Sequence, residues 1–136
     1  MKRVLIAVAS LTVAFGMFAG CAAETTPEPT QVLDDAIHEV ERALGRYVQI
    51  DPNGPAEDVQ RATDRVSSAW ALVVDAAADV DNADISDAQV AYGELVEAVA
   101  EVPEDLSAGE AFAAIEGYVD AFEEAVDDFH DELNVH

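Results

Sequence analysis

Two histidines of the chain each follow an aspartate at a spacing of three residues, in the segments Asp35-Ala-Ile-His38 and Asp127-Asp-Phe-His130. On a helix, residues three apart are neighbours on one face, so each pair could present an imidazole and a carboxylate to the same ion. These two ligand types together suit a divalent transition metal. A buried site of that kind needs several such pairs directed into the core of a helical body.

The positions of these residues on their helices argue against a site in the core. Asp35 and His38 lie opposite the apolar stripe of their helix, and His130 lies at the edge of its own stripe. The spacing resembles the Glu-x-x-His pairs of ferritin-like di-iron bundles, which add a glutamate from each of two further helices. Here the acid is aspartate, and the apolar stripes within 59–80 and 88–102 contain no acid. We therefore predict solvated histidines and no metal ligands.

A run of four aspartates extends from Asp79 to Asp87 in a region expected to form a loop. Calcium prefers six or more oxygen ligands, and such a run supplies several. Read as an EF-hand loop that begins at Asp79, the run fails, because Asp84 stands where glycine is required and Val90 where the bidentate glutamate belongs. Two interpretations remain: a weak, irregular cation site, or a polar loop whose acids favour the N-terminus of the next helix.

Arginine supplies all the positive charge that follows Cys21. The four residues are Arg42, Arg46, Arg61 and Arg65. Two fall late in one predicted helix and two fall early in the next, so a hairpin would gather them at one end, where an anion or a partner's carboxylate could dock. The alternative is ordinary pairing within each helix, Glu39 with Arg42 and Glu57 with Arg61.

No arrangement of nucleophile and base is visible in the sequence. Ser86 and Ser107 each precede a glutamine or glutamate by three residues, which is the pattern of a capping box at the start of a helix. There is no glycine-rich phosphate loop, and Gly93 and Gly117 stand alone within predicted helices, where we expect them to permit close packing. We therefore predict no catalytic residues and no cofactor.

The N-terminal segment has the features of an export signal. Lys2 and Arg3 precede an uncharged, mostly apolar run over 4–19, too short for a typical membrane span. The run ends in Phe18-Ala-Gly-Cys21, which resembles the lipobox of bacterial lipoproteins, although Phe18 stands where that class usually has leucine or another aliphatic residue. The resemblance implies cleavage before Cys21 and lipid attachment to its thiol. The alternatives are an ordinary secretory signal cut near Ala19 and an uncleaved anchor.

The composition restricts what the rest of the chain can be. The 136 residues carry a net charge of −23, and the part from Cys21 onward has four arginines against 29 acids, or −25. Such a chain is not attracted to nucleic acid. One cysteine excludes an internal disulfide framework, while 51% hydrophobic residues favour a folded body over a disordered acidic tail. We divide the chain into a signal peptide at 1–20, a lipidated, extended linker at 21–30 and an acidic helical body at 31–136.

Four amphipathic segments predict the fold of that body. We expect helices from Thr30, as N-cap, to about Val48, from Pro55 to about Val80, from Ser86 to Val102, and from Ser107 onward. The apolar stripes, spaced mainly three and four apart, are Leu33, Ile37, Val40, Leu44 and Tyr47; Val59, Ala62, Val66, Ala69, Val73, Ala76 and Val80; Ala88, Tyr92, Leu95, Val99 and Val102; and Phe112, Ile115, Val119, Phe122, Val126, Phe129 and Leu133. The pattern predicts an all-α, antiparallel four-helix bundle, with a three-helix bundle and one loosely docked helix as the alternative.

These features together predict a lipid-anchored, extracytoplasmic, non-enzymatic binding module of the cell envelope. The expected partners are the membrane, through the lipid on Cys21, and a protein. The alternative function is low-affinity binding of divalent cations, based on the density of acids. The acidity is also consistent with adaptation to a saline habitat, and the heptad-like stripes leave dimerisation open.

Overall fold

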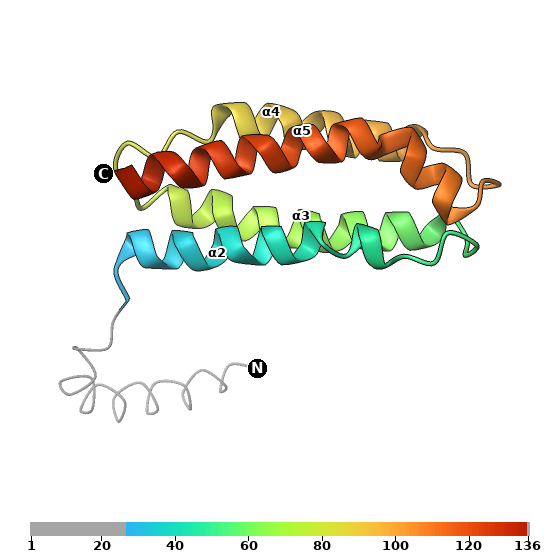
Figure 1. Cartoon of the computed structure of the whole chain (residues 1–136). Coiled ribbons are helices and arrows are strands. Elements are labelled where there is room, and N and C mark those ends of the chain that lie inside the picture. The colour runs from blue at the N-terminus through green and yellow to red at the C-terminus, as the bar shows by residue number, and fades with distance from the viewer. Residues whose placement is uncertain (1–26, 136) are drawn as a thin grey trace, which may run out of the picture.

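The computed structural model describes residues 27–135, which form four α-helices and one short 3-10 helix. The elements are α2 (Pro29–Leu44), η2 (Tyr47–Gln49), α3 (Glu57–Ala77), α4 (Ser86–Glu101) and α5 (Ala108–Val135). Helix α2 packs mainly against α3, and α4 mainly against α5, so two hairpins lie side by side (Figure 1). The predicted four-helix bundle is confirmed, and the described residues contain no named strand.

The ends of α2 differ from those expected from the sequence. Glu28 is the N-cap and Pro29 occupies the first helical position, so the prediction of Thr30 as N-cap is wrong. Proline is favoured at that position, because its fixed φ suits a helix and its missing N–H is not needed there. The helix ends at Leu44, and Tyr47 lies in the tighter turn of η2, which keeps its side chain in the core.

One of the two predicted capping boxes is present. At the start of α5, the backbone N–H of Glu110 donates to Ser107 Oγ at 3.2 Å, and that of Ser107 donates to Glu110 Oε1 at 3.1 Å. The box predicted at Ser86 and Gln89 is wrong. There, Asp84 Oδ1 accepts from the backbone N–H of Ser86 at 3.0 Å and also from its hydroxyl, so Asp84 holds the turn that leads into α4.

Because Asp84, and not Gln89, forms the hydrogen bonds at the start of α4, the side chain of Gln89 is available to contact another helix. Its Oε1 accepts a hydrogen bond of 2.8 Å from the indole N–H of Trp70 on α3. Trp70 is only 2% exposed. Its ring centroid lies 5.9 Å from that of Tyr92 and 5.3 Å from that of Phe122, the latter in an edge-on arrangement. The aromatic contacts and the satisfied N–H together account for the burial of a large polar ring.

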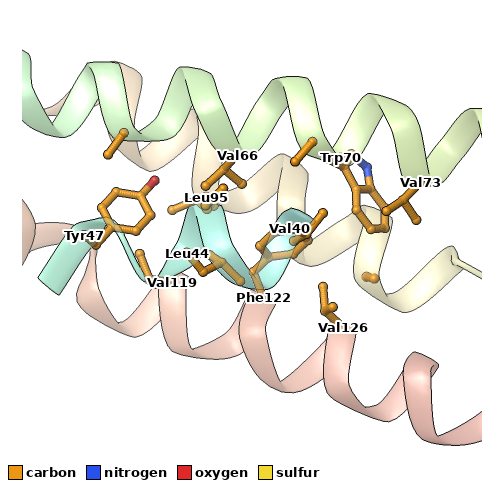
Figure 2. Packing of buried hydrophobic residues seen from close by; sticks show 14 of the residues in the cluster. Val40, Leu44, Tyr47, Val66, Trp70, Val73, Leu95, Val119, Phe122 and Val126 are labelled. Carbon is orange, nitrogen blue, oxygen red and sulfur yellow. The ribbon is translucent and has the colours of Figure 1, made fainter. Parts of the chain in front are cut away.

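The core follows the four predicted stripes closely. Figure 2 shows side chains of all four helices meeting in it, among them Val40, Val66, Leu95 and Phe122. Tyr47 is buried with them, and its hydroxyl lies 2.6 Å from Thr63 Oγ1, which in turn donates to the carbonyl of Val59. Helix α4 buries only Ala88, Leu95 and Val99, whereas Tyr92 and Val102 of its predicted stripe are half-buried.

The connections at the end of the bundle remote from the start of α2 contact one another (Figure 1). The backbone N–H of Ala108 donates to the carbonyl of Gly54 at 2.7 Å, and that of Gly109 donates to the carbonyl of Pro52 at 3.0 Å. A Cβ on Gly109 would lie 2.9 Å from the Cβ of Pro52, so glycine is needed for this approach. The two hairpins are therefore joined by backbone hydrogen bonds at this end.

Gly93 and Gly117 do not serve the close packing that the sequence suggested. Both are exposed within helices, and a Cβ on either would have no atom of another residue within 4 Å beyond its chain neighbours and its own helix backbone. That prediction is wrong, because both residues face away from the other helices.

Candidate functional site

The arginines gather toward the connected end of the α2–α3 hairpin, as the sequence predicted. A groove of about 520 Å³ between the two helices is lined by Arg42, Arg46 and Arg65, by the acids Glu39 and Asp64, and by Leu72. A second hollow of about 330 Å³, toward the connection between α2 and α3, shares Arg46 and Arg65 and adds Arg61, Asp51 and Asp58. We call these two adjoining hollows the arginine groove.

The four arginines differ in their charge partners. Arg42 pairs with Glu39 one turn earlier. Arg61 pairs with Glu57 at 3.2 Å and with Asp58 at 2.6 Å, and these contacts raise the pKa of Arg61 further above its usual value. The predicted pairings within each helix are thus confirmed for these two. Arg46 and Arg65 take part in none of the ion pairs formed among the described residues.

The aspartates of the Asp79–Asp87 run, all of which the structure describes, do not form a cluster close enough to hold a metal ion, but two of them lie near acids in the C-terminal part of α5. These two aspartates line a hollow of about 350 Å³ with three acids of α5. These five residues are Asp84, Asp87, Asp128, Asp131 and Glu132. The hydrogen bonds from the side chain and the backbone N–H of Ser86 lower the pKa of Asp84, so this carboxylate is stabilised in its charged form.

The two histidines that the sequence treated separately are brought together where α2 and α5 meet. His130 Nε2 lies 2.7 Å from Asp34 Oδ1, and this ring N–H must be the donor because a carboxylate only accepts. Its Nδ1 lies 3.6 Å from Glu41 Oε1. The ring of His38 stands edge-on to that of His130, with centroids 5.3 Å apart. Ligand atoms of Asp34, His38 and His130 all lie within 4.8 Å of one another.

The predicted solvent exposure of the two histidines is confirmed for His38 and wrong for His130. The side chain of His38 is 48% exposed, and its Nδ1 contacts the backbone carbonyl of Asp34 at 2.9 Å. That hydrogen bond is the main cause of a raised pKa at His38, and the carboxylates of Glu41 and Asp34 add to it. The side chain of His130 is only 18% exposed.

Part of this cluster could have been found in the sequence, but the predicted pairs included only acids three residues before each histidine. Asp34 and His38 are four residues apart and share a helix face, whereas the pattern drew attention to Asp35. Their third partner, His130, lies 96 residues beyond Asp34 in the sequence. Among the described residues, this is the one place where three or more such side chains gather closely enough to hold a metal ion.

Three serines in the described part of the chain, Ser67, Ser86 and Ser107, have structural partners. Ser67 Oγ accepts from the hydroxyl of Tyr92 at 2.8 Å, Ser86 donates to Asp84, and Ser107 caps α5. None of these three hydroxyls contacts a histidine among residues 27–134. The absence of catalytic residues stays a prediction.

The predicted signal peptide and Cys21 lie outside the described residues. Within 27–135, no helix is long and apolar enough to cross a membrane. No family model, curated protein or solved structure matches this chain.

Proposed function

We propose that this protein is a lipid-anchored, non-enzymatic binding module on the extracytoplasmic face of the cell membrane. The export signal and the lipobox that ends at Cys21 support the anchor. Two acyl chains make such an anchor stable, because each buried methylene contributes about 0.8 kcal/mol. Helix α2 begins at Pro29, so residues 22–28 allow the bundle to stand at most about 25 Å from the lipid.

The observation that carries the binding role is the arginine groove. Arg46 and Arg65 are the residues that its two hollows share and that form no ion pair among the described residues. A guanidinium group binds a carboxylate through two parallel hydrogen bonds, which orients a partner as well as attracting it. Leu72, which is 54% exposed, adds an apolar surface beside them. Acids also line the two hollows, but among the described residues neither Arg46 nor Arg65 pairs with them, so both can bind the carboxylate of a protein segment whose neighbouring apolar side chain contacts Leu72.

The location and surroundings of the groove support the same role. Arg46 follows α2 and Arg65 lies in the first half of α3, so both lie away from the end of the bundle at which α2 begins (Figure 1). An anchor at Cys21 would therefore hold the groove away from the membrane. The rest of the chain is strongly acidic, which attracts a partner that is basic overall. Complementary charge of this kind sets the register of a complex and the rate of its formation.

The binding role is tested in cells with the full chain and a photo-crosslinking amino acid at position 72. The double variant Arg46→Gln/Arg65→Gln should lose the crosslinked partner. The matched variant Arg42→Gln/Arg61→Gln removes the same charge from arginines already paired within their helices, and it should keep the partner. If both doubles keep it equally, the groove is not the binding surface. Mass spectrometry of the mature N-terminus tests the anchor separately, since an unmodified Cys21 would exclude it.

A second candidate function is low-affinity binding of a hard divalent cation in the hollow where Asp84 and Asp87 meet the acids of α5, whose carboxylates would have to move closer together to share one ion. Calcium binds groups of carboxylate oxygens of this kind. It should raise the unfolding midpoint of the full chain more than sodium chloride does at matched ionic strength, and Asp84→Asn/Asp87→Asn should abolish the difference. Equal effects of the two salts would exclude this function.

A further inference from the structure

The cluster of Asp34, His38 and His130 has the ligand types and the compactness of a metal site. Its ligand atoms lie within 4.8 Å of one another, and two of them, Asp34 Oδ1 and His130 Nε2, are 2.7 Å apart. Around a tetrahedral zinc ion, with metal–ligand distances of 2.0–2.2 Å, ligand atoms lie about 3.4 Å apart. Side-chain movements of about 1 Å would therefore bring the three ligand atoms to the spacing at which they could coordinate one zinc ion.

The surroundings of His130 suit a metal ligand. One ring nitrogen faces Asp34, and the other lies 3.6 Å from Glu41 Oε1. Metal-bound histidines commonly direct their second nitrogen toward a carboxylate, which fixes the ring and strengthens the ligand. The adjacent Phe129 is buried in the core, so α5 holds His130 in place while the exposed His38 leaves the site open to solvent.

The charges around the cluster favour a divalent cation. In the metal-free protein, a proton on His130 Nε2 holds that nitrogen against Asp34 Oδ1, and a metal ion would take the position of this proton. Asp34 and Glu41 supply two negative charges that match those of the ion. The net charge of the chain, −23, raises the local concentration of cations. Two imidazole ligands select zinc, cobalt, nickel or copper over calcium and magnesium.

We propose that Asp34, His38 and His130 bind one divalent transition-metal ion, with zinc as the representative, and that Glu41 supports His130 from outside the coordination sphere. The ion would link α2 to α5, the first and last helices of the bundle. This proposal replaces the sequence prediction of no metal ligands. It depends neither on the lipid anchor nor on the arginine groove.

The test uses the full chain, purified in detergent and freed of metal. Zinc chloride titrated into it in a calorimeter should saturate at one ion per chain. The unfolding midpoint should rise with the logarithm of the free zinc concentration above the dissociation constant, since the ion binds only the folded site. Cobalt chloride should give the visible absorption of a cobalt ion bound by nitrogen and oxygen, and zinc should displace it. Absence of saturable binding, or displacement of zinc by an equal concentration of calcium, would overturn the proposal.

The variants separate this site from general binding to an acidic surface. His38→Gln and His130→Gln should each weaken zinc binding by at least about tenfold, and Glu41→Gln by about tenfold. Asp34→Asn should weaken it in the same way, whereas Asp35→Asn removes the same charge from the neighbouring residue and should leave it unchanged. Equal losses in the two asparagine variants would show nonspecific binding. If His130→Gln disturbs folding, as judged by circular dichroism, the exposed His38 decides the question.

Discussion

Replacing Gly93 and Gly117 by alanine should stabilise the bundle by about 1 kcal/mol at each position. Both glycines lie within helices, have ordinary negative φ and are exposed. Alanine restricts the unfolded chain more than glycine does, so the folded state loses less entropy on forming. The gain is realised only where the added methyl group fits.

The structure provides the room at both positions. A Cβ on Gly93 or Gly117 would meet nothing within 4 Å outside its chain neighbours and its own helix backbone, so neither substitution carries a steric cost. The two methyl groups share no contact partner, and their effects should add to about 2 kcal/mol. For a domain of this size, that corresponds to a rise of about 8 °C in the unfolding midpoint.

Gly109→Ala is the matched control, because the same change there should have the opposite sign. Its Cβ would lie 2.9 Å from the Cβ of Pro52 and 3.2 Å from its carbonyl oxygen, so the contact between the two connections would have to open, at a cost of about 1–3 kcal/mol. Urea unfolding followed by circular dichroism at 222 nm measures all three variants. A lower midpoint for Gly93→Ala or Gly117→Ala would refute the reasoning, since it would mean that another surface covers these helix faces.

Three further predictions concern a buried hydroxyl, a helix start and the net charge. Burial raises the pKa of Tyr47 from 10.0 to about 12, so its stabilising contribution is complete below pH 10 and is lost as the pH rises toward 12. Urea unfolding above about pH 11 should show a loss of at most about 3 kcal/mol that Tyr47→Phe lacks. Asp84→Ala should cost about 1 kcal/mol in urea unfolding, and more than Ser86→Ala, because Asp84 holds the turn into α4. If the acidity is an adaptation to salt, thermal stability should rise steadily up to molar sodium chloride, and an indifferent midpoint would contradict this.

The sequence determined the features that repeat along the chain. The apolar stripes placed nearly all of the core correctly, because a helix that must bury one face repeats apolar residues every three or four positions. It also located the α5 capping box and the intrahelical partners of Arg42 and Arg61, which all act between residues of one turn. It placed the arginines at one end of a hairpin, since adjacent helices with a short connection run antiparallel.

Only the tertiary structure decided which distant side chains meet. The rotation of α5 about its axis brings His130 to Asp34 and His38, and residues 96 apart in sequence leave no periodic signal. The same holds for Trp70, whose burial is possible because Gln89 of another helix accepts a hydrogen bond from its indole N–H. Gln89 therefore does not form the predicted capping box. Both outcomes depend on how whole helices are turned toward each other, and the packing of all four helices fixes this together.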